Sequence, residues 1–294
     1  MQEPLYSFLS APFVHASVGE ADSPVRLLAH IRACMALSRL SSCVPVLWAE
    51  GSESPLSRAD RLWEFAMGKC GVSAFSLADR FRLCDALYAL CRETALVPVS
   101  GREDLCEGLL SSLLEDRALT GQPVAGDEDT VCACCRALQS ALFPWVEEDD
   151  SWFRSLCATL SGWCAEQATD GSWSGISAVQ AWHRLSVLNR HSWLFRDHSF
   201  DAAVSVGCRY YGTAFCHAPA TPDTACAFLE ALSGGHLLSC SAEGEERALG
   251  MLLAVLRDAD AEEDACLYIR SVLLEHHVLR RLDDFRTERP SCIA

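Results

Sequence analysis

The chain carries very little positive charge. Lys69 is the only lysine among 24 basic residues, which face 40 acidic residues, and the formal net charge of the 294 residues is −16. Proteins bind nucleic acids chiefly by neutralising phosphates with lysine and arginine. A surface with this net charge repels such a polyanion. The composition therefore indicates that nucleic acids are not partners.

Long hydrophobic runs are also missing. A helix that spans a bilayer needs about 20 consecutive apolar residues, and the longest apolar stretches, such as residues 248–256, are much shorter. Residues 1–4 contain no basic side chain of the kind that begins a secretory signal. We therefore expect no integral membrane segment and a cytoplasmic protein.

The chain is rich in cysteine, and hydrophobic residues make up 50% of it, which is enough for a sizeable core. The 17 cysteines are odd in number, and most fall inside helical patterns. Disulfide-dense scaffolds are usually shorter than about 80 residues, whereas a free cysteine packs as a small apolar side chain. We expect reduced thiols in a core.

Patterns typical of strands are nearly absent. Apolar residues instead recur three and four residues apart in about eleven segments, which short clusters of Gly, Pro, Ser or Asp separate. In residues 77–91, for example, Phe81, Cys84, Leu87 and Cys91 share one helical face. The sequence therefore predicts an all-α fold.

The helical segments form a repeat. Equivalent segments begin at Asp129, Ile176 and Asp223, at steps of 47 residues, and the next begins at Asp264 after 41. Each start is followed nine residues later by a leucine, and residues 25–40 and 77–90 provide two earlier members, which makes six. Periods of this length are typical of helical-hairpin repeats.

A second set of five segments alternates with these six and is more amphipathic. It comprises residues 59–67, 103–114, 152–167, 200–211 and 245–256. The first set is apolar nearly all round, which is typical of buried helices. We therefore predict a single domain over residues 22–285, an α/α toroid of about six hairpins with the first set inside. Residues 1–21 are expected to form an N-terminal extension and residues 286–294 a tail.

One turn carries a motif. Gln167, Gly171 and Trp173 have the spacing Gln-x-x-x-Gly-x-Trp, between an outer and the following inner segment. At this point the chain resembles the terpene-cyclase and prenyltransferase α/α toroid family, in which such a motif ties adjacent hairpins together. Triterpene cyclases carry several copies, and this chain carries one. The resemblance implies a structural role for the three residues.

A second stretch, residues 127–131, reads Asp-Glu-Asp-Thr-Val. It resembles the Asp-x-Asp-(Asp/Thr)-Thr-Ala motif of class II terpene cyclases, although it is one position short. The resemblance implies that Asp127 and Asp129 are catalytic acids that protonate a C=C bond or an epoxide, since crowded carboxyl groups favour keeping a proton. The alternative is helix capping, because Asp129, Asp223 and Asp264 all open inner segments and Asp is a preferred N-cap.

Four aromatic residues on the inner segments, Tyr88, Trp182, Phe228 and Tyr268, are candidates for substrate binding. In a cyclase their π faces stabilise a carbocation, and in the alternative they fill a core. The resemblance thus implies acid-initiated cyclisation of an apolar isoprenoid or polyene substrate in an aromatic-lined cavity, without a metal or other cofactor. Because the class II acid works at the junction of two helical domains, a partner subunit is a possible requirement.

Two alternatives stay open. The first is a non-catalytic toroid that binds a peptide or a protein partner. The second rests on Cys216-His217, which resembles the Cys-His-Gly zinc segment of lanthionine cyclases, another α/α toroid family. In this chain Trp173 replaces a second zinc-binding cysteine and Ala218 replaces the glycine. A zinc site needs three protein ligands, so this alternative is a degenerate member of that family.

Overall fold

The structure is a computed structural model that describes residues 3–15, 23–43, 55–70, 75–93, 101–114, 122–143, 150–235, 242–258 and 260–288. Within these ranges it contains twelve α-helices and no strand, which confirms the predicted all-α fold. No helix in the described ranges has the length and hydropathy needed to cross a membrane.

The helices form two alternating sets. The odd-numbered helices are α1 (Glu3–His15), α3 (Pro55–Cys70), α5 (Arg102–Leu114), α7 (Ser151–Glu166), α9 (Asp201–His217) and α11 (Ala242–Val255). The even-numbered helices are α2 (Pro24–Cys43), α4 (Leu77–Glu93), α6 (Glu128–Leu142), α8 (Ala178–Phe195), α10 (Pro222–Gly235) and α12 (Glu263–Glu288).

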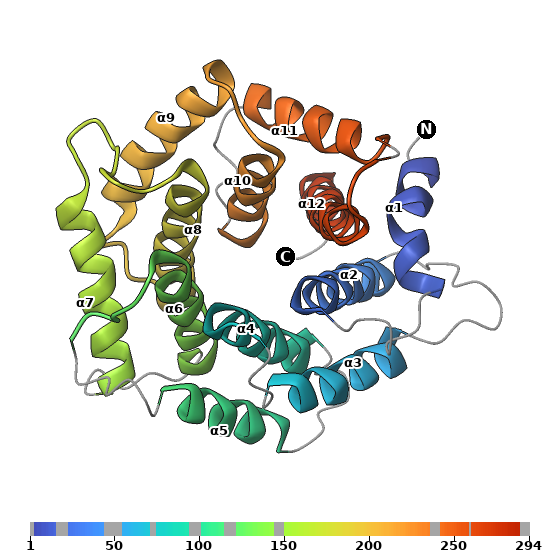
Figure 1. Ribbon diagram of the computed structural model, residues 1–294, viewed down its shortest axis with the longest axis horizontal. Coiled ribbons are helices and arrows are strands. Elements are labelled where there is room, and N and C mark those ends of the chain that lie inside the picture. The colour runs from blue at the N-terminus through green and yellow to red at the C-terminus, as the bar shows by residue number, and fades with distance from the viewer. Residues whose placement is uncertain are drawn as a thin grey trace.

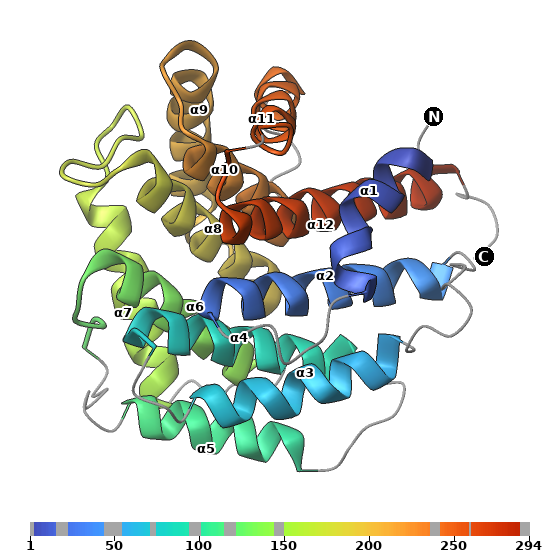
Figure 2. The ribbon, with the colours of Figure 1, turned by 45° about the vertical axis from the view of Figure 1, so that its right-hand side comes forward.

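The two sets occupy two concentric layers. In Figure 1 the even-numbered helices surround the centre of the molecule and the odd-numbered helices lie outside them. Each even-numbered helix packs against the next, and α12 packs against α2, so the inner layer returns to its first member. Figure 2 shows α12 and α2 running side by side. The chain therefore brings its first and last inner helices together.

The composition of each helix agrees with its layer. The inner helix α6 buries residues on all sides, among them Val131, Cys134 and Leu138, whereas the outer helix α5 buries one stripe of four residues that includes Cys106 and Leu110. Burial of apolar surface from water is the main favourable term in folding. Thirteen cysteines whose side chains the structure describes are free thiols, and seven of these are buried in this core.

Helices lie beyond both boundaries of the predicted domain, residues 22–285. Helix α1 lies in the predicted N-terminal extension, yet it packs against α2 and α12 as an outer helix. Its Phe13 is buried, with its ring edge-on to His30 at 5.3 Å between centroids. Helix α12 also continues to Glu288, past the predicted boundary at residue 285. Pro12 lies inside α1, and proline is unusual in the interior of a helix. The sequence therefore did not predict a helix over residues 3–15.

Polar contacts join the first and last inner helices, α2 and α12. Arg26 in the first turn of α2 donates to Asp264 in the first turn of α12, and its Nη2 lies 3.1 Å from Glu263. The hydroxyl of Ser23 also donates to Asp264, at 2.9 Å. Asp264 therefore joins two helices, rather than serving only to open its own helix.

The Gln167–Trp173 turn joins outer helices, as the motif implied. Gln167 follows the last residue of α7, and its Nε2 donates to the carbonyl of Ala203 in α9 at 3.1 Å. Trp173 donates from Nε1 to the carbonyl of Trp163 at 2.7 Å and stacks on Tyr211 of α9. These contacts are structural, because both polar side-chain groups are used to satisfy backbone carbonyls.

Candidate binding cavity

The inner helices enclose a large cavity at the centre of the molecule. Its volume is about 1530 Å³, and residues from all six inner helices line it. This exceeds the roughly 300–1,000 Å³ typical of small-molecule pockets. Arginines reach it from five of these helices, among them Arg32, Arg82, Arg92, Arg136 and Arg190. The walls are therefore strongly charged, whereas the sequence predicted an aromatic lining.

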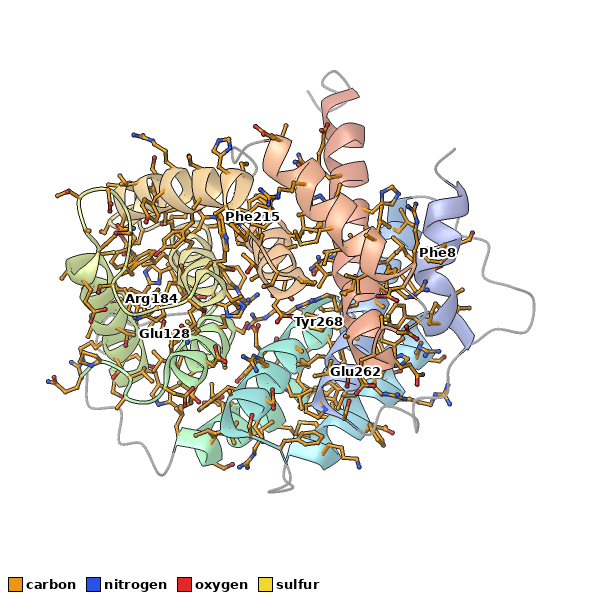
Figure 3. All side chains as sticks on the ribbon, turned by 45° about the horizontal axis from the view of Figure 1, so that its top comes forward. Phe8, Glu128, Arg184, Phe215, Glu262 and Tyr268 are labelled. Carbon is orange, nitrogen blue, oxygen red and sulfur yellow. The ribbon has the colours of Figure 1, made fainter. Side chains whose placement is uncertain are left out.

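One group of polar residues surrounds Glu230 of α10. Its Oε1 accepts a hydrogen bond from Arg32 Nη1 of α2 at 2.6 Å and another from the hydroxyl of Tyr268 of α12. Arg32 Nε also lies 3.3 Å from Glu275, and His183 Nε2 of α8 lies 4.0 Å from Glu230. Four inner helices thus meet at one carboxylate, and Figure 3 shows Tyr268 near the centre of the molecule.

The charges of this group depend on one another. Burial alone would raise the pKa of Glu230, but Arg32 and His183 outweigh it, and the pKa falls to about 2. Burial opposes the charge of Arg32, but Glu230 holds the pKa of Arg32 well above its ordinary value. Burial lowers the pKa of His183 in spite of Glu230. Near neutral pH the group is therefore an ion pair beside a neutral histidine.

Buried histidines make the folded state sensitive to mild acid. Burial, with Arg58 nearby, lowers the pKa of His30 to about 4, and burial also lowers the pKa of His183, His191 and His276. The unfolded chain binds protons at these sites below pH of about 6.5, and the folded chain does not. Stability should thus be full above that pH and fall as the pH drops toward about 4.

Urea unfolding between pH 7.5 and 4 tests this expectation. We expect the unfolding free energy of His30→Gln to fall less steeply with decreasing pH than that of the wild type. The variant lacks the proton that the unfolded wild-type chain binds at His30. The control is His198→Gln at a side chain that is 74% exposed, which should keep the wild-type slope. Equal slopes for His30→Gln and the wild type would show that His30 is not held neutral by burial.

A second polar group surrounds Asp85 of α4. Arg190 Nη1 of α8 donates to Asp85 Oδ1 at 3.0 Å, and the Ser140 hydroxyl of α6 donates to the same oxygen at 2.5 Å. Arg136 Nε lies 3.6 Å from Asp85 Oδ2. Arg92 Nη2 donates to the carbonyl oxygens of Ser140 and Phe143 at the end of α6, each at 2.5 Å.

The pKa shifts in this group indicate an excess of positive charge. Burial would raise the pKa of Asp85, but Arg190 and Arg136 outweigh it and lower the pKa. Burial also lowers the pKa of Arg190, and Arg136 and Arg92 lower it further against the opposing effect of Asp85. Arginine almost always keeps its charge in proteins. Arg136 and Arg190 therefore share the carboxylate of Asp85, and the charges of Arg136 and Arg92 repel that of Arg190.

The three acidic side chains of the predicted catalytic motif, residues 127–129, contact different partners. Asp127 is the N-cap of α6: its carboxylate accepts from the backbone N–H and the hydroxyl of Thr130, at 3.0 and 2.7 Å. Glu128 forms a two-pronged ion pair with Arg184 of α8, at 2.6 and 2.7 Å, and Figure 3 labels the two residues next to each other. Asp129 lines the cavity with its side chain 50% exposed, 3.8 Å from Arg82. Capping thus falls on Asp127, whereas the Glu128 and Asp129 carboxylates each lie beside an arginine.

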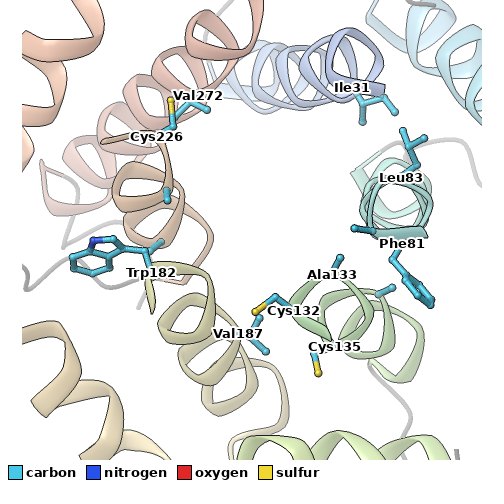
Figure 4. Packing of buried hydrophobic residues seen from close by; sticks show 14 of the residues in the cluster. Ile31, Phe81, Leu83, Cys132, Ala133, Cys135, Trp182, Val187, Cys226 and Val272 are labelled. Atoms are coloured by element: carbon cyan, nitrogen blue, oxygen red, sulfur yellow. The ribbon is translucent and has the colours of Figure 1, made fainter. Parts of the chain in front are cut away.

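The four aromatic candidates are also separated. Tyr268 lines the cavity, whereas Tyr88, Trp182 and Phe228 are buried and are not among its lining residues. Trp182 points away from the centre in Figure 4 and meets Phe228 at 4.9 Å between ring centroids. Phe228 in turn stacks on Phe215 of the outer helix α9. Three of the four therefore fill the space between the layers, because each inner helix must also bury a face against its outer neighbours.

The possible zinc segment does not gather ligands. Cys216 and His217 end α9, where His217 is exposed and the carbonyl of Cys216 accepts a hydrogen bond from Arg247. In the described part of the chain, no three His, Cys, Asp or Glu side chains lie together as metal ligands.

Sequence analysis missed the charged residues of the cavity, although the repeat contained a signal for them. Arg136, His183 and Glu230 follow one another at intervals of 47 residues, so they occupy equivalent positions on α6, α8 and α10. All three line the cavity. Ionisable residues at one position of otherwise apolar buried helices are candidates for function, and this position could have been read from the repeat.

Comparison with known proteins yields no match to a protein-family model, a curated protein or a solved structure. The resemblance to terpene cyclases therefore rests on two short motifs, and the cavity is the main evidence on function.

Proposed function

We propose that the chain is an α/α toroid of six hairpins that acts as a binding module, and that its central cavity takes up a peptide segment of a protein partner. The observation that carries this proposal is the cavity of about 1530 Å³ with charged walls from all six inner helices. Its size favours a ligand larger than a typical small molecule.

The chemistry of the walls favours a polar ligand. An apolar chain in this cavity would remove water from Arg136, Arg190 and Glu230 without replacing its hydrogen bonds, and burying charge in that way is strongly unfavourable. A peptide offers carbonyl groups, N–H groups and charged side chains that can replace the water. Charges of both signs on the walls therefore support peptide binding over isoprenoid binding.

Acid-initiated cyclisation stays a prediction. It is supported by the resemblance of residues 127–131 to the class II motif, and it needs a carboxylic acid that stays protonated in a dry site. Against it, Asp127 is engaged as a helix cap, and Asp129 is half exposed beside Arg82. A substrate-dependent product from prenyl diphosphates or squalene-type chains that Asp129→Asn abolishes, detected by mass spectrometry, would favour the cyclase instead.

A library of short peptides tests the binding function. Ala89 is half buried on α4 and lines the cavity, so Ala89→Trp should fill part of the cavity and weaken binding of selected peptides by about tenfold or more. The control is Ala202→Trp at an exposed position of α9, which should bind as the wild type does. Peptides that bind Ala89→Trp with unchanged affinity, or a library without a binder, would contradict the proposal.

A further inference from the structure

The Asp85 group contains more positive charge than its neighbours neutralise. Asp85 is the carboxylate that both Arg136 and Arg190 contact. Arg92 has Glu103 of α5 at 3.6 Å, but that side chain is 63% exposed on the outer layer. Two guanidinium groups thus share one carboxylate, with a third beside them.

Other nearby acids are already engaged. Glu230 accepts hydrogen bonds from Arg32 and Tyr268. Asp79 and Asp129 both form ion pairs with Arg82. Within the described part of the chain, the buried Nε of Arg136 makes no hydrogen bond. Arg136 Nε lies 3.6 Å from Asp85 Oδ2, and the partly exposed side chain of Arg136 lines the cavity.

Hydrogen bonds hold Arg92 and Arg190 in place, and all three arginines are partly exposed. Two carbonyl oxygens at the end of α6 fix Arg92, and Asp85 and Ser140 fix Arg190. The side chains of Arg92, Arg136 and Arg190 keep exposures of 27%, 24% and 17%. Preorganised guanidinium groups form strong, charge-assisted hydrogen bonds with carboxylate and phosphate oxygens.

We propose that Arg92, Arg136 and Arg190 form a subsite for an oxyanion, a phosphate or a carboxylate, in the cavity. The proposal rests on the proposed binding function for its biological use, since the oxyanion would belong to the bound segment. The subsite itself depends only on the arginines. The bound oxyanion offsets the mutual repulsion of the three guanidinium groups.

Titration of the purified full chain with inorganic phosphate at constant ionic strength tests the subsite, by calorimetry and by the shift in Tm. We expect saturable binding of one phosphate and a rise in Tm, because a ligand that binds only the folded state stabilises it. Arg136→Gln should weaken binding about tenfold or more, as one charge-assisted hydrogen bond is lost. Arg136→Lys keeps the charge without the planar donor pair, and its loss should be smaller.

Two further variants, one expected to tighten phosphate binding and one expected to leave it unchanged, make the test specific. Asp85→Asn removes the competing carboxylate and should tighten phosphate binding. Arg209→Gln removes an arginine at an exposed position of the outer helix α9, outside the cavity lining, and it should leave binding unchanged. Unsaturable binding, binding by an adventitious surface ion that Arg136→Gln does not weaken, or equal losses in Arg136→Gln and Arg209→Gln would overturn the subsite.

Competition between a peptide and phosphate distinguishes a failure of the subsite from a failure of the proposed peptide-binding function. A selected peptide with an acidic or phosphorylated residue should compete with phosphate, and the same peptide with that residue replaced by alanine should not. Phosphate binding that depends on Arg136, in a protein that binds no peptide, would support the subsite and contradict only the peptide function.

Discussion

Glu230→Gln should lower the free energy of unfolding by about 3 kcal/mol, the largest effect that we expect from one charge. The side chain of Glu230 is 7% exposed, and Arg32 beside it is 19% exposed. Removing one partner of a buried ion pair leaves the other charge uncompensated in a poorly solvated site, which typically destabilises a protein by about 3–5 kcal/mol. Glu275, at 3.3 Å from Arg32, keeps the loss near the lower end.

Urea unfolding of the variant at neutral pH measures this loss. Because the pKa of Glu230 lies near 2, below its ordinary value of 4.5, its contribution is full above pH 4.5 and is lost as the pH falls toward 2. The difference between variant and wild type should shrink over that window. The control is Glu263→Gln, whose side chain is 77% exposed beside Arg26, and it should unfold as the wild type does. A neutral Glu230→Gln would contradict the buried pair.

Gly171→Ala should destabilise the protein by about 2–5 kcal/mol. Gly171 has φ +96°, a conformation that side chains disfavour, and a Cβ there would lie 2.4 Å from the carbonyl oxygen of Val206 in α9. The clash is with backbone, so α9 must move away from the turn. Overpacking costs about 1–3 kcal/mol, and a strained backbone adds about 1–2 kcal/mol. The shift would also stretch the hydrogen bond from Gln167 to Ala203.

Gly175→Ala separates the two contributions. Gly175 has φ +81°, but a Cβ there would have no atom within 4 Å. Gly175→Ala should therefore lower the free energy of unfolding only through backbone strain, by about 1–2 kcal/mol. Thermal unfolding of both variants gives the comparison, and equal losses would mean that α9 does not press against the turn.

The helices could be predicted from sequence because their signal is local. Apolar residues three and four apart define one face of a helix wherever the helix packs, and the spacing of Asp129, Ile176 and Asp223 indicated the repeat. Helix α1 was missed because Pro12 interrupts its pattern. The Gln167 turn could also be predicted, since its contacts depend on residues close together in sequence.

The site was harder to predict because it depends on which side of each inner helix faces the centre. A helix that is apolar nearly all round gives no such signal, so Trp182 and Phe228 were as plausible for the cavity as Tyr268. Isolated charges in such a helix carry the information instead. Arg32, Asp85 and Glu230 come from three distant segments, and only the packing of α2, α4 and α10 brings them to one cavity.

A double-mutant cycle on Arg32 and Glu230 tests most directly whether helices from distant parts of the chain close around a charged centre. These residues lie 198 positions apart in sequence, and Arg32 Nη1 lies 2.6 Å from Glu230 Oε1 in the structure. The unfolding free energies of Arg32→Gln, Glu230→Gln and the double variant should give a favourable coupling of about 1–3 kcal/mol. Losses that add within about 0.5 kcal/mol would mean that the two side chains do not meet, and that α2 and α10 do not border a common cavity.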